Sequence, residues 1–162
     1  MRGDSVLFLD NIGDTVYSIT NMPKKKPRII LDTNVLYAGL YSSKGASFRV
    51  LQAIEEGKLQ MVMSTTLLFE YEDILKRNQL ILGLSNQEIE KILDYFCVQS
   101  EHQRIYFLWR PRLPDPKDDH LLELAIASGT KLIVTHNTKD FRGVEEFDIK
   151  SITPKKLLEE IL

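Results

Sequence analysis

The chain has 162 residues, which is enough for one domain with a full core and too few for two ordinary domains. Its 43% hydrophobic and 27% charged residues are typical of a soluble globular protein, and its uncharged apolar runs are too short to cross a membrane. The net charge of −2 offers no global attraction to nucleic acid, so such a partner needs a local patch or metal ions. Cys97 is the only cysteine, which excludes an intramolecular disulfide and a cysteine metal cluster and makes a cytoplasmic location the default expectation.

Residues 1–27 are interpreted as an extension and residues 28–162 as the folded domain. The extension mixes isolated apolar residues with turn formers and lacks the charge cluster and apolar run of a signal peptide. It predicts either a pair of short strands at residues 5–9 and 15–20 or a segment without regular structure. The basic run at residues 24–26 is interpreted as a solvated edge before the first strand of the domain.

The stretch RIILDTNVLYAGL opens the domain with a short strand that ends in an acid. Ile29, Ile30 and Leu31 form an apolar run with β-branched residues, which is typical of a strand buried on both faces of a parallel sheet. Ligands of open α/β sheets collect outside the carboxyl ends of the strands. We therefore expect Asp32 to face a functional crevice.

Short apolar strands and amphipathic helices alternate along the rest of the domain. Ser64 is placed to cap one helix, and Ser85 with Glu88 forms a capping box for another. The expected strands are residues 59–63, 104–108, 131–135 and 147–152; the expected helices are residues 35–41, 46–56, 65–77, 86–97, 118–128 and 154–162; and residues 109–117 form a proline-rich loop. This alternation predicts a three-layer α/β/α sandwich around a mainly parallel four- to five-stranded sheet.

Further polar residues recur at the edge of the sheet where Asp32 emerges. Glu70 and Glu72 flank the apolar face of their helix about equally, so helical periodicity does not choose between them. Taken singly, each candidate has an ordinary explanation as a solvated helix acid, a helix cap or a turn residue. The other candidates are the acids of DPKDD, Asp115, Asp118 and Asp119, and the residues after the fourth strand, Thr135, Asn137 and Asp140.

The joint occurrence of these acids predicts a metal site. Two carboxylates about 4 Å apart repel by about 4 kcal/mol at an effective dielectric constant near 20, so a cluster of them requires cations. The three histidines, at positions 102, 120 and 136, are scattered, and a site of oxygen ligands favours Mg²⁺ or Mn²⁺. Such ions are suited to phosphodiester hydrolysis.

Three motifs together resemble the PIN-domain family, especially the bacterial VapC-like proteins that are classed as toxins of toxin-antitoxin pairs. They are IILDTNVLYAGL, STTLLFEYEDIL and DPKDDHLLELAIASGTKLIVTHNTKDF, and the resemblance extends over about residues 28–152. It implies a metal-dependent ribonuclease with an RNA substrate, a cognate antitoxin and a homodimeric state.

The resemblance also implies a quartet of catalytic, metal-binding acids. Asp32 is the first and Glu70 the second, which resolves the choice between Glu70 and Glu72. Asp118 best matches the third, with Asp115 or Asp119 as substitute or support. Asp140 is carried over as the fourth, with Asn137 as its polar neighbour. Supporting roles near water or phosphate fall to Thr33, Asn34 and Thr135.

An aspartate that ends the first strand is also compatible with functions other than a nuclease. A haloacid-dehalogenase-type phosphatase requires a second aspartate two residues after the first, where this chain has Asn34. A weakly active or inactive PIN fold that serves as an RNA-binding or protein-interaction module stays open, because the fourth position falls between Asn137 and Asp140. The cations that we consider for steering an RNA backbone are Arg110, Arg112, Lys117 and Lys139.

Overall fold

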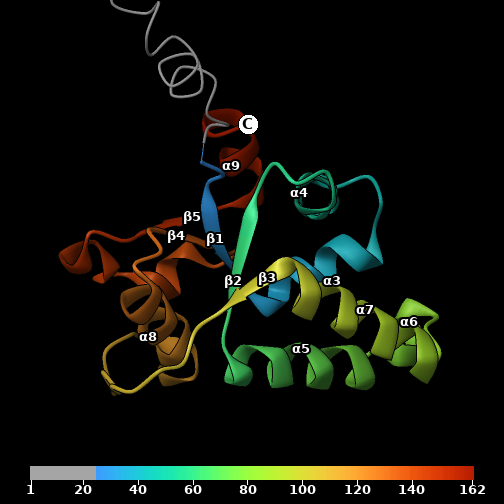
Figure 1. The fold of residues 1–162 in the computed structure, drawn as a ribbon, viewed down its shortest axis with the longest axis horizontal. Coiled ribbons are helices and arrows are strands. Elements are labelled where there is room, and N and C mark those ends of the chain that lie inside the picture. Colours follow the sequence, from blue (N-terminus) through green and yellow to red (C-terminus); the bar gives the residue numbers. More distant parts are fainter. Residues whose placement is uncertain (1–24) are drawn as a thin grey trace, which may run out of the picture.

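The computed structural model describes residues 25–162, so the expectations for residues 1–24, including the strand pair, lie outside the described part. Within that part, five strands form one parallel sheet in the order β3-β2-β1-β4-β5 (Figure 1). The strands are β1 (Arg28–Leu31), β2 (Gln60–Met63), β3 (Ser100–His102), β4 (Leu132–Val134) and β5 (Lys150–Ile152). The predicted α/β sandwich is confirmed, and its sheet is parallel throughout.

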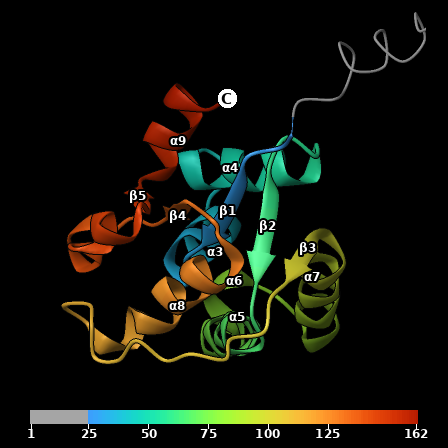
Figure 2. The ribbon, with the colours of Figure 1, turned by 60° about the vertical axis from the view of Figure 1, so that its left-hand side comes forward.

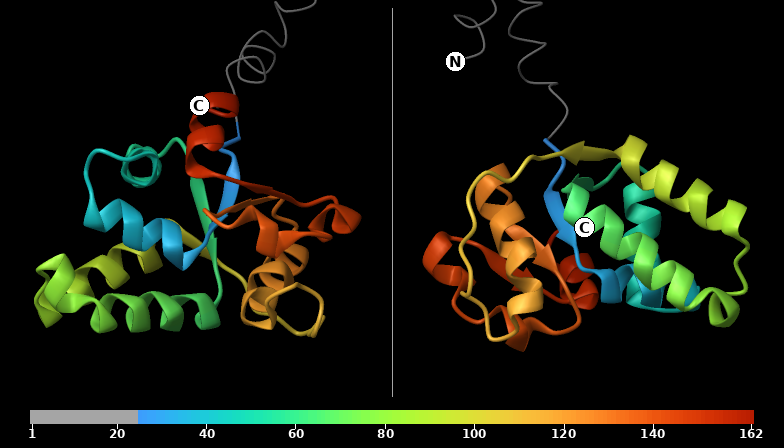
Figure 3. Two further views of the ribbon diagram at one scale, coloured as in Figure 1. Left: turned by 180° about the vertical axis from the view of Figure 1, so that it is seen from behind. Right: turned by 90° about the horizontal axis from the view of Figure 1, so that it is seen from below.

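Helices connect the strands and cover the sheet. Helix α3 packs on α4 and α5, α7 packs on β2 and β3, and α8 packs on β1 and β4. Helix α4 also contacts α9, which lies beside it in both views of Figure 3. The helices are α3 (Thr33–Tyr41), α4 (Ala46–Glu55), α5 (Thr65–Arg77), α6 (Gln79–Leu82), α7 (Asn86–Gln99), α8 (Asp119–Ser128) and α9 (Pro154–Glu160), with 3₁₀ turns η1 (Pro116–Asp118), η2 (Thr138–Phe141) and η3 (Val144–Phe147). None of the described helices is long and apolar enough to span a membrane.

The helix starts follow the capping signals in the sequence. The Ser64 hydroxyl accepts a hydrogen bond from the Leu67 amide at 3.2 Å, at the start of α5. The capping box of α7 is complete, because Ser85 Oγ accepts from the Glu88 amide and the Glu88 carboxylate accepts from the Ser85 amide. Gly129 ends α8 with a φ of 69°, a left-handed conformation that glycine adopts without a Cβ penalty.

The expected strand at residues 104–108 is wrong. The strand in this part of the chain is β3, three polar residues that pair with β2 directly after α7. The last ladder bond runs from the Gln103 amide to the Met63 carbonyl at 2.9 Å, where β2 ends. Because β2 offers no residue beyond Met63 for pairing, the following apolar run leaves the sheet, and it forms no regular secondary structure.

The core fixes the carboxyl end of β1 against α5. Ile29, Ile30 and Leu31 are fully buried, as expected for a central parallel strand. Tyr71 on α5 is also fully buried, and its hydroxyl donates to the Leu31 carbonyl at 2.5 Å. This bond sets the position of α5 relative to the residue that follows Leu31.

Candidate active site

Asp32 follows directly on the carboxyl end of β1. Seen from below in Figure 3, right, β1 lies between α5 and α8. The Asp32 amide donates to the Val134 carbonyl at 2.9 Å, which continues the β1–β4 pairing by one residue. Although Asp32 precedes α3, its carboxylate makes no capping bond to that helix. The side chain is therefore a buried acid at the sheet edge that is available for another role.

Three polar side chains hold this carboxylate. Its Oδ2 accepts from Thr135 Oγ1 at 2.7 Å and from Asn34 Nδ2 at 3.0 Å, and its Oδ1 accepts from Thr33 Oγ1 at 3.3 Å. Burial raises the pKa of Asp32, and the hydrogen bonds from Thr135 and Thr33 act in the opposite direction. The bonds also restrict the carboxylate to one orientation.

The same network fixes the loop after β4. Thr135 is fully buried, and its hydroxyl accepts from the Asn137 amide at 3.0 Å. Asn34 Oδ1 accepts from the His136 amide at 3.3 Å. These bonds hold residues 135–137, which lead into the turn that carries Asp140, against Asp32 and Asn34. The Asn137 side chain itself is exposed.

Asp118 has the clearest electrostatic signature of an acidic cluster. Its side chain is half-buried at the start of α8. Burial, followed by the charges of Asp32, Asp115 and Asp140, raises the pKa of Asp118 to about 7, and His120 acts in the opposite direction. The charges of Asp32 and Asp140, two of the other acids assigned from the resemblance, thus reach Asp118.

Glu70 lies on the side of α5 that faces α8. Its Oε2 is 2.9 Å from His120 Nε2, whereas Glu72 pairs with Lys76 at 2.5 Å on the same helix. The charges of Asp32 and Glu70 add to burial in raising the pKa of Tyr71 well above its usual value. Glu70, and not Glu72, therefore borders the space between β1 and α8.

His120 was not predicted from the sequence as part of this region. It is buried, and neither ring nitrogen has a hydrogen-bond partner within the described residues, because the contact with Glu70 lacks hydrogen-bond alignment. Unpaired buried polar groups are costly and uncommon. The ring nitrogens of His120 could therefore form a hydrogen bond with Glu70 after a small reorientation, or with a bound ligand.

Asp119 and Asp115 are engaged elsewhere in the loop before α8. Asp119 is fully buried, and its Oδ1 accepts from the Leu113 amide at 2.7 Å and from the Arg112 amide at 3.2 Å. Asp115 Oδ1 accepts from the Lys117 amide at 2.9 Å, and its charge also reaches Asp118. Asp119 thus holds the loop, while Asp115 lies at the border of the acidic cluster.

Glu123 is, after His120, a second residue that the sequence analysis did not identify. It is 1% exposed, and it accepts from the Trp109 amide at 3.0 Å and from both Nε and Nη2 of Arg110, at 2.9 and 3.1 Å. The only signal in the sequence is its spacing of four residues from Asp119 in an otherwise apolar helix, which places both acids on one face. Neither acid faces the cluster.

The four basic residues considered for binding an RNA backbone differ in whether they already form ion pairs. Arg110 is paired with Glu123 and Arg112 with Glu146. Lys117 and Lys139 are exposed beside Asp118 and Asp140 in the sequence. Of the four cations considered for an RNA backbone, the two lysines are thus the pair without an ion-pair partner among the described residues.

The donor set fits a hard divalent cation in its chemistry. Asp32, Glu70, Asp118 and Asp140 would supply oxygen ligands, and burial together with the neighbouring negative charges raises the pKa of Asp118. Within residues 25–162, however, no three His, Cys, Asp or Glu side chains are already close enough together to hold an ion. Small side-chain movements are therefore needed to complete a site.

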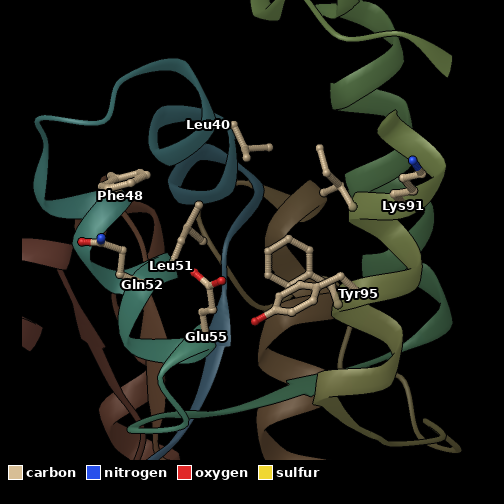
Figure 4. Close-up of a pocket in the computed structure, with 9 residues that line it drawn as sticks. Leu40, Phe48, Leu51, Gln52, Glu55, Lys91 and Tyr95 are labelled. Carbon is tan, nitrogen blue, oxygen red and sulfur yellow. The ribbon is translucent and has the colours of Figure 1, made fainter. Parts of the chain in front are cut away.

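The largest apolar hollow among the main described cavities lies away from these acids. It has a volume of about 330 Å³ and opens between α4 and α7, where Leu51 and Tyr95 face one another (Figure 4). Its lining includes none of the acids assigned to the quartet. The candidate chemistry is thus located at the sheet edge and not in this cavity.

Comparisons with known proteins agree with the fold and the motif order. A family model described as PIN domain matches residues 28–139. Among solved structures, the chain is similar to the crystal structure of VapBC2 from Rickettsia felis bound to a DNA fragment from their promoter, with a TM-score of 0.55, 15% identity and coverage of 78% of this chain and 98% of that chain. At this identity the likeness shows the fold. A comparison with curated proteins found no match.

Proposed function

The chain belongs to the PIN-domain family, and from this premise we propose that it is a metal-dependent ribonuclease that hydrolyses RNA phosphodiester bonds. The observation that carries the proposal is that the charges of Asp32 and Asp140 add to burial in raising the pKa of Asp118, so carboxylates from three separate segments lie near one another. We assign the activity to residues 28–162 and regard residues 1–27 as an extension.

Asp32, Glu70, Asp118 and Asp140 would hold Mg²⁺ or Mn²⁺. When bound, the ion supplies charge neutralisation on the phosphate and lowers the pKa of a water nucleophile. Thr33, Asn34 and Thr135 keep the Asp32 carboxylate in a fixed orientation through the three hydrogen bonds described above. That pre-organisation reduces the reorganisation needed when substrate binds.

The remaining residues adjust charge and orientation. His120 lies against Glu70 and restricts where that carboxylate can turn. The pKa of Asp118 is about 7 in the absence of a cation. Below that pH, a cation that binds to Asp118 therefore has to displace a proton. Lys117 and Lys139 are exposed near the acids and are suited to contact phosphate groups.

We further propose that the nuclease is the toxin of a toxin-antitoxin pair in the cytoplasm, with a cognate antitoxin and a homodimeric state. The VapC-like motifs and the similarity in fold to VapBC2 support this biological role. Co-expression with the product of an adjacent small gene should suppress RNA cleavage if the pairing is correct. Continued cleavage in a stable complex would contradict it.

An inactive module for RNA or protein binding is the second candidate function. It is favoured by the need for side-chain movement before three acids can share an ion, and by the exposed Asn137 near the fourth position. Such a module would bind RNA without cutting it at any Mn²⁺ concentration.

The first prediction separates these functions through Asp32. With Mn²⁺ or Mg²⁺, the purified full chain should cut single-stranded RNA, and Asp32→Asn should lower the rate by about 100-fold or more because it removes a charged ligand. Circular dichroism should show a retained fold. The measurement is the initial rate of cleavage of a fluorescent oligoribonucleotide.

Glu72→Gln is the matched control for Glu70→Gln, because the two glutamates share a helix and Glu72 instead pairs with Lys76. Glu70→Gln should lose activity and Glu72→Gln should retain it. Wild-type rates in both Asp32→Asn and Glu70→Gln would show that the site is assigned wrongly.

A further inference from the structure

Four consecutive large apolar side chains are exposed in the segment that leaves the sheet after β3. The exposed fractions are 81% for Tyr106, 75% for Phe107, 64% for Leu108 and 42% for Trp109. A contiguous exposed patch of this kind is uncommon on a monomer and marks a binding surface more often than an isolated apolar residue does. We call residues 104–113 the aromatic segment.

The aromatic segment is fixed in place by buried contacts. Glu123 accepts from the Trp109 amide and the Arg110 guanidinium, and Asp119 accepts from the Leu113 amide. The Trp109 ring also packs edge-on against Phe147, with ring centroids 5.6 Å apart. The side chains are therefore exposed on an anchored backbone, which limits the entropy that a ligand has to remove.

This anchored segment spans the two helices that carry proposed ligands. One end borders a hollow whose lining includes Thr65 and Tyr106, at the start of the helix that carries Glu70. The other end runs along α8 towards Asp118. In Figure 2 the yellow chain after β3 passes below the sheet towards α8. The aromatic segment thus lies along the edge where the acids emerge.

Its chemistry matches a single-stranded nucleic acid. Three of the four exposed side chains are flat rings, and Phe107 and Trp109 have centroids 6.1 Å apart. A hollow of about 210 Å³ separates Tyr106, Phe107 and Trp109 from the last turns of α8. Residues 104–113 contain no acid and three arginines. Arg110 and Arg112 are paired with Glu123 and Glu146, so Arg104 is the arginine of this segment that forms no ion pair within the described residues. Aromatic rings beside cations are the usual combination for stacking bases and pairing phosphates.

We propose that the aromatic segment is a stacking platform for single-stranded RNA, with bases on Tyr106, Phe107 and Trp109 and the strand led towards the acidic cluster. The inference rests on the proposed function for its connection to cleavage, and it adds the surface that would hold the RNA as a single strand, since a duplex keeps its base faces stacked inside. A protein partner fits less well, because the larger apolar cavity, which is lined by both aliphatic and aromatic side chains, lies apart, between α4 and α7.

Trp109 provides a direct test, because it is the only tryptophan in the chain. In EDTA, where metal-dependent cleavage does not occur, a single-stranded oligoribonucleotide should quench tryptophan fluorescence of the full protein in a saturable way. Phe107→Ala and Tyr106→Ala should each weaken binding by about 5-fold or more, the usual effect of removing one stacking ring. A duplex of the same sequence should quench much less.

Tyr41→Ala is the matched control, because Tyr41 is an aromatic residue that is 63% exposed on α3, away from the aromatic segment. It should bind the oligonucleotide as the wild type does. Equal affinities of the wild type, Phe107→Ala and Tyr106→Ala would overturn the platform, as would equal quenching by duplex and single strand.

The platform and the nuclease can fail separately. Quenching without cleavage in Mn²⁺ would retain the platform and reject the proposed nuclease. Cleavage of RNA with no quenching and no effect of Phe107→Ala would retain the nuclease and reject the platform. If the segment docks a protein instead, oligonucleotides will neither quench Trp109 nor distinguish the variants, which also rejects the platform.

Discussion

At the residue scale, Asp32 and Asp118 are two buried or half-buried acids in different surroundings. Asp32 has three hydrogen-bond donors around its carboxylate, and these offset part of the cost of burial. For Asp118, the charges of neighbouring acids add to the cost of burial. Asp118 is therefore the residue whose charge state should respond most to pH and to cations.

The pH dependence of stability should identify Asp118. Its pKa is about 7 in the folded protein against an ordinary value of 3.8, so the folded state binds more protons between these pH values. The free energy of unfolding contributed by Asp118 is therefore highest below pH 3.8 and falls as the pH rises to about 7. Asp118→Asn should remove this decrease in the free energy of unfolding, because asparagine does not ionise.

In EDTA at pH 8, we expect Asp118→Asn to be more stable than the wild type by about 1–2 kcal/mol, a value reduced because solvent screens a half-buried side chain. At pH 4 the difference should disappear. Urea unfolding of both proteins at a series of pH values measures it. Parallel profiles from pH 4 to 8 would mean that the neighbouring acids do not act on Asp118.

At the element scale, α8 has two functions on two faces. Its first turn contributes to the acidic cluster through Asp118, while Asp119 and Glu123 hold the aromatic segment against it. Buried acids are normally paired, and here the partners are backbone amides and one arginine. The irregular loop before α8 is thus ordered by the helix that follows it.

Removal of Glu123 should loosen the aromatic segment. Glu123→Ala leaves the Trp109 amide and Arg110 without their acceptor, and we expect a loss of about 1–3 kcal/mol in the free energy of unfolding. Trp109 emission should shift to longer wavelengths, and chymotrypsin should cut residues 106–109 faster.

Glu72→Ala serves as the control for this prediction, since it breaks an exposed ion pair with Lys76 and should cost no more than about 0.5 kcal/mol. If Glu123→Ala leaves both the Trp109 emission and the proteolysis rate unchanged, Glu123 does not anchor the segment.

At the scale of the whole molecule, the parallel sheet gathers acids that are far apart in the chain. The carboxyl ends of β1 and β4 adjoin because these strands pair, and α5 and α8 are drawn to the same edge by their packing on each other and by the Tyr71 bond to Leu31. The resulting negative charge opposes folding, and a cation should relieve it.

Mn²⁺ should therefore stabilise the whole fold. At 100 times the dissociation constant, binding to the folded state alone adds about 2.7 kcal/mol to the free energy of unfolding. Thermal unfolding followed by circular dichroism should show this increase in the wild type and in Glu72→Gln, and its loss in Asp32→Asn. An equal increase in Asp32→Asn would locate the ion elsewhere.

The sequence by itself determined the features that depend on local physics. The buried run before Asp32, the caps at Ser64 and Ser85 and the ending at Gly129 each follow from residues a few positions apart. Because apolar strands alternated with helices, the parallel sandwich could be predicted as well. The order of the three motifs indicated the family, and the family resemblance in turn indicated which acids to consider as metal ligands.

Only the tertiary structure decided the features that depend on distant partners. Helical periodicity left Glu70 and Glu72 equal and the family resemblance favoured Glu70, but only the structure shows Glu70 beside His120 while Glu72 pairs with Lys76. The end of β2 at Met63 decided that residues 104–108 leave the sheet, although their apolar side chains favour a strand. Asp119 and Glu123 became anchors because the loop folds back on α8. Polar side chains acquire these roles from contacts across the fold, which spacing along the chain does not encode.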